Sequence, residues 1–215
     1  MSDTVTQTMD HLYRYQRYFY DITRKYYLFG RDQLIEDAGI KPGETVCEVG
    51  CGTARNLIKV AQRYPQARVF GLDASNAMLE TASNSVRRSG VEDRVKLIQG
   101  YAQTFTPADF GLDRPFDHIL FSYTLTIIPE PVAAMDNALA QLRPGGTIQV
   151  VDFGDLSGLP VWFQRLQVWW LKIFHVEYRP AIPDWFQRRG EDGSGQVSTR
   201  SIGGRYTNFY TLIKT

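Results

Sequence analysis

The clearest chemical pattern in the sequence is the glycine-rich run VCEVGCGTAR at residues 46–55. Gly50 and Gly52 fall where a buried strand would turn into a helix. Glycines there let a ligand approach the backbone, and the helix N-terminus offers it free N–H groups. Glu48 stands two positions before the first glycine. A carboxylate there would repel the pyrophosphate of a dinucleotide, whereas it suits a ligand that carries an ammonium group.

A second carboxylate, Asp73, ends the next apolar run, RVFGLD, about twenty residues after the glycine-rich turn. At this spacing a carboxylate can accept hydrogen bonds from both hydroxyls of a ribose. The segment LRPGG at residues 142–146 completes the set of motifs. The two carboxylates therefore predict a ligand with both a ribose and an ammonium group.

These residues need a scaffold of alternating strands and helices. Short apolar runs predict strands at residues 45–50, 68–73, 94–100, 116–123 and 146–153. Amphipathic patterns predict helices at residues 54–64, 75–90 and 131–142. Ser75 or Asn76 would cap the second helix and Gly90 would end it. Strands separated by such helices form a parallel sheet, so the predicted fold class is α/β.

The end of the chain has a different pattern. Two extended runs around Gly203 and Gly204 predict a hairpin, which would add an antiparallel edge to the parallel sheet. We expect a single domain over residues 1–215. It would comprise a helical arm at residues 9–38, a ligand-binding core at 44–152, an aromatic amphipathic insertion at 159–195 and the hairpin at 196–215.

Composition narrows the class of protein. The formal net charge of +1 gives no argument for nucleic acid as a partner. Cys47 and Cys51 have neither a disulfide framework nor zinc spacing, which favours a reducing cytoplasm. The start MSDTVTQTMD lacks the features of a secretory signal, and no apolar run approaches 18 residues. No cluster of His, Cys or carboxylates has metal spacing, and His118 is expected to pack within its strand.

Two segments depart from the average composition. Residues 9–31 and 159–190 each carry five basic and two acidic side chains, and the second holds all four tryptophans. In each segment aromatic and aliphatic residues recur at helical spacing. One helical face would hold Leu12, Tyr15, Phe19, Ile22, Tyr26 and Phe29, and the other Trp162, Phe163, Leu166, Trp169, Trp170, Ile173 and Phe174. Tryptophans opposite basic residues are typical of a helix in a membrane interface, although both helices could instead cover the sheet.

The motifs E-V-G-C-G, G-L-D-A-S and L-R-P-G-G, in this order, resemble those of the class I S-adenosylmethionine-dependent methyltransferases. The resemblance covers residues 44–152 and implies a Rossmann-like, mostly parallel seven-stranded sheet. It also implies S-adenosyl-L-methionine as cofactor and S-adenosyl-L-homocysteine as product. The implied cofactor-binding residues are Glu48, Gly50, Cys51, Gly52, Asp73, Ala74, Met78, Ala102 and Ser122. Ala54 replaces the third glycine of the pattern, and Tyr101 replaces a frequent aspartate beside the adenine, for which Gln103 could substitute.

A narrower resemblance lies at residues 9–35. The elements Y-D-x-T-R and F-G-R, followed by GCGTARNL, resemble the bacterial methyltransferase of betaine lipid synthesis. This implies conversion of diacylglycerylhomoserine to diacylglyceryl-N,N,N-trimethylhomoserine in three methylations. The implied partners are an amino lipid, the anionic inner face of the membrane, on which a cytoplasmic protein would bind peripherally, and an upstream lipid-synthesis enzyme.

Methyl transfer to an amine is an in-line displacement, so positioning the nitrogen supplies much of the rate effect. Tyr20 and Asp21 are candidates to orient the amine or receive its proton. Tyr20, Tyr27 and Tyr123 are candidates for an aromatic cage around the methylated nitrogen, because cation–π contacts remain when no N–H is left. Arg31 or Arg205 could bind the homoserine carboxylate.

Other functions remain open on the sequence. Within the enzymes, the alternatives are a phosphatidylethanolamine N-methyltransferase and a soluble-amine methyltransferase whose aromatic helices form a lid. From another class, the chain could be a noncatalytic cofactor-binding subunit that activates a partner. A nicotinamide dehydrogenase is disfavoured by Glu48, which would repel pyrophosphate.

Overall fold

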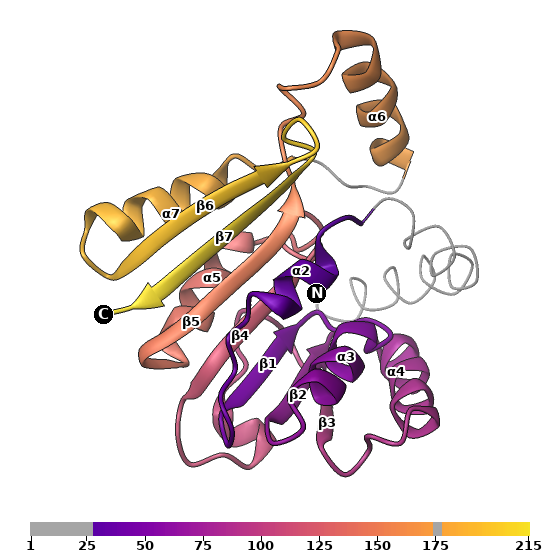
Figure 1. Ribbon diagram of the computed structural model, residues 1–215, viewed down its shortest axis with the longest axis vertical. Helices are drawn as coiled ribbons and strands as arrows, with labels where there is room; N and C mark the ends of the chain where they lie inside the picture. The colour runs from indigo at the N-terminus through magenta and orange to yellow at the C-terminus, as the bar shows by residue number, and fades with distance from the viewer. Residues whose placement is uncertain (1–27, 174–177) are drawn as a thin grey trace, which may run out of the picture.

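The computed structural model describes residues 28–173 and 178–215. Its centre is a seven-stranded sheet in the order β3-β2-β1-β4-β5-β7-β6. The strands are β1 (Thr45–Val49), β2 (Arg68–Asp73), β3 (Val95–Gln99), β4 (Phe116–Ser122), β5 (Leu142–Phe153), β6 (Gly195–Ile202) and β7 (Thr207–Lys214). β1 to β5 are parallel, whereas β7 is antiparallel to both β5 and β6 (Figure 1). The predicted α/β fold with an antiparallel C-terminal hairpin is thereby confirmed.

Helices cover both faces of this sheet. One face packs against α2 (Arg31–Glu36), α3 (Arg55–Arg63) and α4 (Asn76–Arg88), and the other against the 3₁₀ turn η1 (Pro107–Phe110), α5 (Pro131–Ala140) and α7 (Ala181–Glu191). Alternating strand residues serve the two faces, as the pleat requires. In β1, for example, Val46 joins the apolar cluster under α3, and Cys47 joins the one under α5. Ser75 caps α4 by accepting a hydrogen bond from the Met78 N–H.

A third apolar cluster lies at the carboxyl ends of β4 and β5. It joins Leu28, Tyr123, Phe153 and Phe209, and Trp170 of α6 (Val161–Ile173) packs against it. α6 itself stands beyond the carboxyl end of β5, away from the sheet (Figure 1). This cluster therefore attaches both α6 and the segment before α2 to the end of the sheet where β1, β2 and β4 also terminate.

The predicted aromatic insertion at residues 159–195 forms two helices with different surroundings. α6 keeps Trp162 and Trp169 exposed, whereas α7 packs on the sheet and buries Trp185. The Trp185 indole donates a hydrogen bond from Nε1 to Asp136 Oδ1 at 2.7 Å. Trp185 therefore belongs to the core and adds nothing to an exposed aromatic face, contrary to what its place in the segment indicated.

The predicted arm at residues 9–38 is described from residue 28 onward. Helical periodicity suggested that Phe29 continues an amphipathic helix, but Gly30 adopts a left-handed conformation with φ of 81° and α2 begins after it. Such a conformation is favourable for glycine and ends the pattern. Tyr20, Asp21 and Tyr27, together with most of the arm's predicted apolar face, lie outside the described residues.

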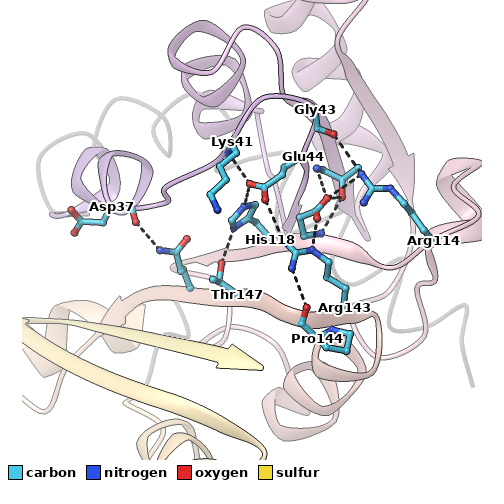
Figure 2. A network of polar contacts seen from close by, with 12 residues as sticks. Asp37, Lys41, Gly43, Glu44, Arg114, His118, Arg143, Pro144 and Thr147 are labelled. Carbon is cyan, nitrogen blue, oxygen red and sulfur yellow. Dashed lines mark hydrogen bonds and ion pairs between the residues drawn. The ribbon is translucent and has the colours of Figure 1, made fainter. Parts of the chain in front are cut away.

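A polar network joins the amino ends of β1, β4 and β5 (Figure 2). His118 bonds through Nε2 to Glu44 Oε2 at 2.8 Å and through Nδ1 to Thr147 Oγ1 at 2.8 Å. Arg143 pairs with both Glu44 and Asp117. His118 is buried, as the sequence indicated, but it is fixed by these hydrogen bonds as well as by packing. The network crosslinks the edge of the sheet opposite the carboxyl ends of these strands.

No helix within residues 28–173 and 178–215 has the length and apolar character needed to cross a bilayer.

Candidate active site

A cavity of about 830 Å³ opens at the carboxyl ends of β1, β2 and β4. Ligands of open parallel sheets bind at this edge, because the strand-to-helix turns meet there. The cavity wall includes all nine residues predicted to bind a cofactor, which are Glu48, Gly50, Cys51, Gly52, Asp73, Ala74, Met78, Ala102 and Ser122. The structure thus brings together residues that are up to 74 positions apart in the sequence.

Glu48, near the end of β1, is the most unusual of these residues because it is an acidic residue only 2% exposed. Its Oε1 accepts a hydrogen bond from Asn56 Nδ2 at 2.7 Å, whereas Oε2 is buried with no hydrogen-bond partner among the described residues. Burial raises the pKa of Glu48 to about 7, although the Asn56 hydrogen bond and the charge of Arg31 oppose that shift. A buried carboxylate oxygen in a cavity wall needs a cationic partner, and a ligand ammonium group fits it.

A chain of polar contacts fixes the orientation of Glu48. Asn56 Oδ1 accepts from Arg55 Nη1 at 3.0 Å, and Arg55 Nη2 donates to Asp32 Oδ1 at 2.7 Å. Lys59 Nζ reaches the same Asp32 oxygen at 2.7 Å. The sequence analysis missed Asn56. The signal that could have found it is a polar residue among the apolar positions of the predicted helix. A helical pattern alone, however, does not show that such a residue is buried and contacts a functional side chain.

The glycine-rich turn does not present its first N–H groups to a ligand. The N–H groups of Gly50 and Cys51 both donate to the Leu72 carbonyl, at 2.8 and 2.9 Å, and the Gly52 N–H donates to Asp73 Oδ2 at 2.9 Å. These three N–H groups are therefore paired within the protein, whereas the expectation of free N–H groups concerned the N-terminus of α3, which begins at Arg55. A turn with paired donors and a carboxylate before it is a poor site for pyrophosphate. Its glycines serve close approach instead, since a Cβ on Gly50 would overlap Thr124 Cγ2.

Asp73 lies at the end of β2 with both carboxylate oxygens oriented. Oδ2 accepts from the Gly52 N–H, and Oδ1 accepts from the Ser75 N–H at 2.9 Å. Each carboxylate oxygen can accept more than one hydrogen bond, so the same group can also hold a diol. Met78 and Ala102, both buried, continue the cavity wall beyond it. The predicted ribose and base positions therefore lie side by side in the cavity.

Ser122 and Tyr123 follow β4 at the other side of the glycine-rich turn. The Ser122 Oγ is buried without a hydrogen-bond partner among the described residues. The Tyr123 hydroxyl donates to the Phe29 carbonyl at 2.7 Å and bonds to Thr207 Oγ1 at 2.8 Å. Burial raises the pKa of Tyr123 well above its usual value, so its hydroxyl is a weak proton acceptor or donor for catalysis. The ring still lines the cavity.

The two arginines predicted to bind a substrate carboxylate lie in different places. Arg31 lines the cavity at the start of α2. Arg205 is exposed in the turn before β7, pairs with Asp155 Oδ2 at 2.8 Å and does not line the cavity. Within residues 28–173 and 178–215, no group of three or more His, Cys, Asp or Glu residues is arranged to hold a metal ion.

Comparisons with known proteins agree with this geometry. A family model described as a methyltransferase domain matches residues 40–178. The demethylmenaquinone methyltransferase of Listeria welshimeri is 26% identical over 163 residues, which are 75% of this chain and 63% of that protein. The trans-aconitate 2-methyltransferase of Azoarcus sp. is 29% identical over 117 residues, which are 54% of this chain and 42% of that protein. The chain thus spans less than two thirds of the length of these two relatives.

Among solved structures, the S-adenosylmethionine-dependent methyltransferase SibL has a TM-score of 0.69 and 22% identity, and the match covers 91% of this chain and 57% of that chain. At this identity the likeness supports the fold alone. The family model, in contrast, covers more than half of the chain, and the cavity it spans carries the carboxylates that suit an ammonium group and a ribose. The chain therefore belongs to the methyltransferase-domain family, whose class I members use S-adenosylmethionine as methyl donor.

Proposed function

We propose that this chain is an S-adenosylmethionine-dependent N-methyltransferase that converts diacylglycerylhomoserine to diacylglyceryl-N,N,N-trimethylhomoserine. The observation that carries the cofactor part of this proposal is Glu48, a buried carboxylate in the cavity wall whose Oε2 has no partner among the described residues. Together with the oriented carboxylate of Asp73, it suits the ammonium group and the ribose of one cofactor molecule.

S-adenosylmethionine, when bound, supplies an electrophilic methyl group. Glu48 would hold its ammonium, Asp73 its ribose, and Met78 and Ala102 would line the adenine. Ser122 and Tyr123 would then lie beside the reacting methyl group, because they follow β4 next to the glycine-rich turn. The chain's contribution to the rate would be positioning, which can account for several kcal/mol of the barrier.

The acceptor amine must be neutral when it attacks, so a proton has to leave it. The hydroxyl of Tyr123 is engaged by Phe29 and Thr207, which disfavours it as the proton acceptor. Tyr20 and Asp21 therefore stay our candidates for orienting the amine or receiving its proton. The ring of Tyr123, with those of Tyr20 and Tyr27, is suited to surround the methylated nitrogen by cation–π contact.

Support for a lipid acceptor comes from α6. Trp162 and Trp169 are 69% and 62% exposed, and Leu166 between them is 53% exposed. Trp170, next to Trp169 in the helix, packs against the apolar cluster at the carboxyl ends of β4 and β5, and so does Ile127, which lines the cavity. The helix with the exposed aromatic surface and the wall of the cavity thus pack against the same apolar cluster. We infer that α6 holds a cytoplasmic protein peripherally on the anionic inner face of the membrane, where an upstream lipid-synthesis enzyme would deliver its substrate.

The test is lipid mass spectrometry after incubation of the purified chain with S-adenosylmethionine and mixed liposomes. The liposomes contain diacylglycerylhomoserine and phosphatidylethanolamine, and parallel reactions contain ethanolamine, demethylmenaquinone or trans-aconitate. We expect mono-, di- and trimethylated homoserine lipid in sequence and no other product.

Methylation of phosphatidylethanolamine or of ethanolamine alone would replace the proposed acceptor. Methylation of demethylmenaquinone or trans-aconitate would instead show that the chain acts on the same acceptor as one of the named relatives. Cofactor binding without any product, followed by stimulation of a partner methyltransferase, would indicate a noncatalytic subunit.

A further inference from the structure

A second hollow, of about 560 Å³, lies between the first turns of α5 and α7, and we refer to it as the α5–α7 hollow. Glu130, the residue before α5, lines both this hollow and the cavity that holds the candidate cofactor site. The two spaces are therefore neighbours and meet at Glu130. A ligand in the α5–α7 hollow would lie next to whatever the cavity binds.

Packing between α5 and α7 fixes the walls of the α5–α7 hollow. Trp185 of α7 joins Ala134 and Met135 of α5 in one apolar cluster. Asp136 of α5, which lines the hollow, accepts a hydrogen bond from Trp185 Nε1 at 2.7 Å and pairs with Arg189 Nη2 at 2.8 Å. The charge of Asp136 is thus matched within the protein, and the hollow is held open by contacts that do not depend on a ligand.

Two further charges in the wall of the hollow are not matched in this way. Arg179, just before α7, has a buried Nε with no hydrogen-bond partner among the described residues, and it forms no ion pair with any of them. The exposed side chain of Glu130 makes no capping hydrogen bond with α5. The backbones of both residues are fixed, because the Arg179 carbonyl accepts from the Ile182 N–H at 3.0 Å and the Glu130 carbonyl accepts from the Ala134 N–H at 3.1 Å. The hollow therefore presents one cation and one anion from the starts of two packed helices.

The two arginines expected from the sequence to bind the acceptor carboxylate are less suited to that role. Arg205 pairs with Asp155 at 2.8 Å and lies outside the cavity wall. Arg31 lines the cavity, but it already takes part in an interaction within the protein, and its charge acts on Glu48. Arg179 is thus the better candidate for a carboxylate that arrives with the acceptor.

We propose that the α5–α7 hollow binds the amino-acid head group of the acceptor lipid, with Arg179 holding its carboxylate and Glu130 its ammonium group. The inference rests on the proposed function and assigns the carboxylate to Arg179 in place of Arg31 or Arg205. A zwitterionic head group needs a receptor that presents both opposite charges in one space. The guanidinium fork matches a carboxylate with two parallel hydrogen bonds, which adds both affinity and orientation.

This arrangement also sets the orientation of the head group. Because Glu130 stands where the hollow meets the cavity, the nitrogen of the acceptor would point toward the cofactor and its carboxylate away from it. The amine gives up a proton before it attacks, so Glu130 serves recognition of the arriving ammonium and of the methylated products. An amine without a carboxylate would leave Arg179 unmatched, which makes Arg179 the residue that selects for the amino-acid head group.

The test is calorimetric titration of two soluble probes into the chain saturated with S-adenosylhomocysteine. One probe is glycerylhomoserine, the acceptor without its acyl chains, and the other is the methyl ester of its carboxylate. We expect Arg179→Gln to weaken binding of glycerylhomoserine about tenfold and to change binding of the ester less than about twofold. Arg179→Lys should recover part of the loss. Arg188→Gln, which removes an exposed arginine of α7 that lines neither space, should match the wild type.

Glu130→Gln separates the second contact from the first. Both probes keep the ammonium group, so this variant should weaken both by about two- to fivefold, a modest factor because the carboxylate is exposed. Glu80→Gln, which removes an exposed carboxylate of α4, is the matched control and should bind both probes like the wild type. The affinity of Arg179→Gln for S-adenosylhomocysteine should equal that of the wild type, because Arg179 does not line the cavity.

An equal loss for both probes in Arg179→Gln would overturn the inference, because it would mean that Arg179 does not recognise the carboxylate. Wild-type protein that binds neither probe, or an Arg179→Gln variant that binds both like the wild type, would also overturn it. The proposed function is tested separately by methylation of the lipid. If Arg179→Gln methylates diacylglycerylhomoserine with an unchanged KM, the inference fails and the proposed function stands. If the probes bind as expected but no homoserine lipid is methylated, the proposed function fails and the head-group site stands.

Discussion

The hydroxyl of Tyr123 donates a hydrogen bond to the carbonyl oxygen of Phe29 at 2.7 Å, across 94 positions of sequence. The same hydroxyl bonds to Thr207 Oγ1 at 2.8 Å, so one side chain joins the segment before α2, the loop after β4 and the start of β7. Tyr123 also has φ of 54°, a left-handed conformation that costs free energy in a residue other than glycine. We infer that the hydrogen bonds of Tyr123 hold the F-G-R segment, residues 29–31, beside the cavity.

This interpretation predicts a specific phenotype for Tyr123→Phe. The variant keeps the ring but leaves the Phe29 carbonyl and Thr207 without their partner, which should lower the free energy of unfolding by about 1–3 kcal/mol in urea titrations. The maximal rate of methylation should fall less than about tenfold, because the ring that lines the cavity remains. A loss of 100-fold or more, together with loss of the rise in rate with increasing pH, would instead identify the hydroxyl as the proton acceptor.

Glu48→Gln should stabilise the protein in the absence of cofactor. The folded-state pKa of about 7 lies above the usual glutamate value of 4.5, so the contribution of Glu48 to stability is complete below pH 4.5 and is lost as the pH rises through 7. A neutral amide escapes that loss and can still accept from Asn56. We expect the variant to be more stable than the wild type by roughly 1–3 kcal/mol at pH 8 and equal to it at pH 4.5. A less stable variant at pH 8 would show that the charge is already compensated within the protein.

The network at the amino ends of the strands should matter for stability and not for the cofactor (Figure 2). Asp117 is buried, accepts from Thr45 and pairs with Arg114 and Arg143. Burial raises its pKa, but these hydrogen bonds and charges outweigh that effect and lower it to about 2. Its contribution to stability is therefore present above pH 3.8 and lost as the pH falls through 2.

Asp117→Ala should accordingly lower the free energy of unfolding by about 2–4 kcal/mol at pH 7. The affinity for S-adenosylhomocysteine should stay within twofold of the wild type, since the cavity lies at the opposite edge of the sheet. The exposed Asp113, changed to Ala, is the control and should have little effect. A large loss of affinity with unchanged stability would contradict the separation of the two edges.

The double variant Trp162→Ala and Trp169→Ala tests the proposed membrane surface. Both side chains are more than half exposed, so their removal should leave the melting temperature nearly unchanged. We expect sedimentation with anionic liposomes to fall at least tenfold, because interfacial tryptophans supply much of the binding of such helices. Ile213→Ala, which removes an exposed apolar side chain of β7, should sediment like the wild type. Equal sedimentation of all three proteins would remove α6 from the membrane proposal.

The parallel part of the sheet could be predicted from the sequence because β1 to β5 each contain a short apolar run between clear turn signals. The run around Glu48 and the end of RVFGLD also located the cavity, since carboxyl ends of parallel strands must meet at one edge. β5 begins earlier than expected, at Leu142, because the LRPGG segment is itself part of the strand. The pairing of β5 with β4 shifts register between Phe116 and His118. Proline and glycine in that segment favoured a turn.

The tertiary partners could not be predicted in the same way. Nothing in one sequence indicates that Asn56 would reach Glu48, or that the Leu72 carbonyl would take the N–H groups of Gly50 and Cys51. Trp185 shared its aromatic segment with the tryptophans of α6, and only the packing of α7 on the sheet separates it from them. Such contacts depend on how far apart the helices and strands lie in space, and the periodicity of a sequence carries no information about those distances.

The most direct test of the account is calorimetric titration of S-adenosylhomocysteine into the wild type and Glu48→Gln at pH 7.5 and pH 6. We predict that the wild type binds and that its affinity falls roughly five- to tenfold at pH 6, because Glu48 must then lose a proton to hold the ammonium group. The variant should bind at least tenfold more weakly at pH 7.5 and with little dependence on pH. Wild-type protein that fails to bind, or a Glu48→Gln variant that binds as tightly as the wild type at pH 7.5, would contradict the assignment of Glu48 and with it the cofactor site.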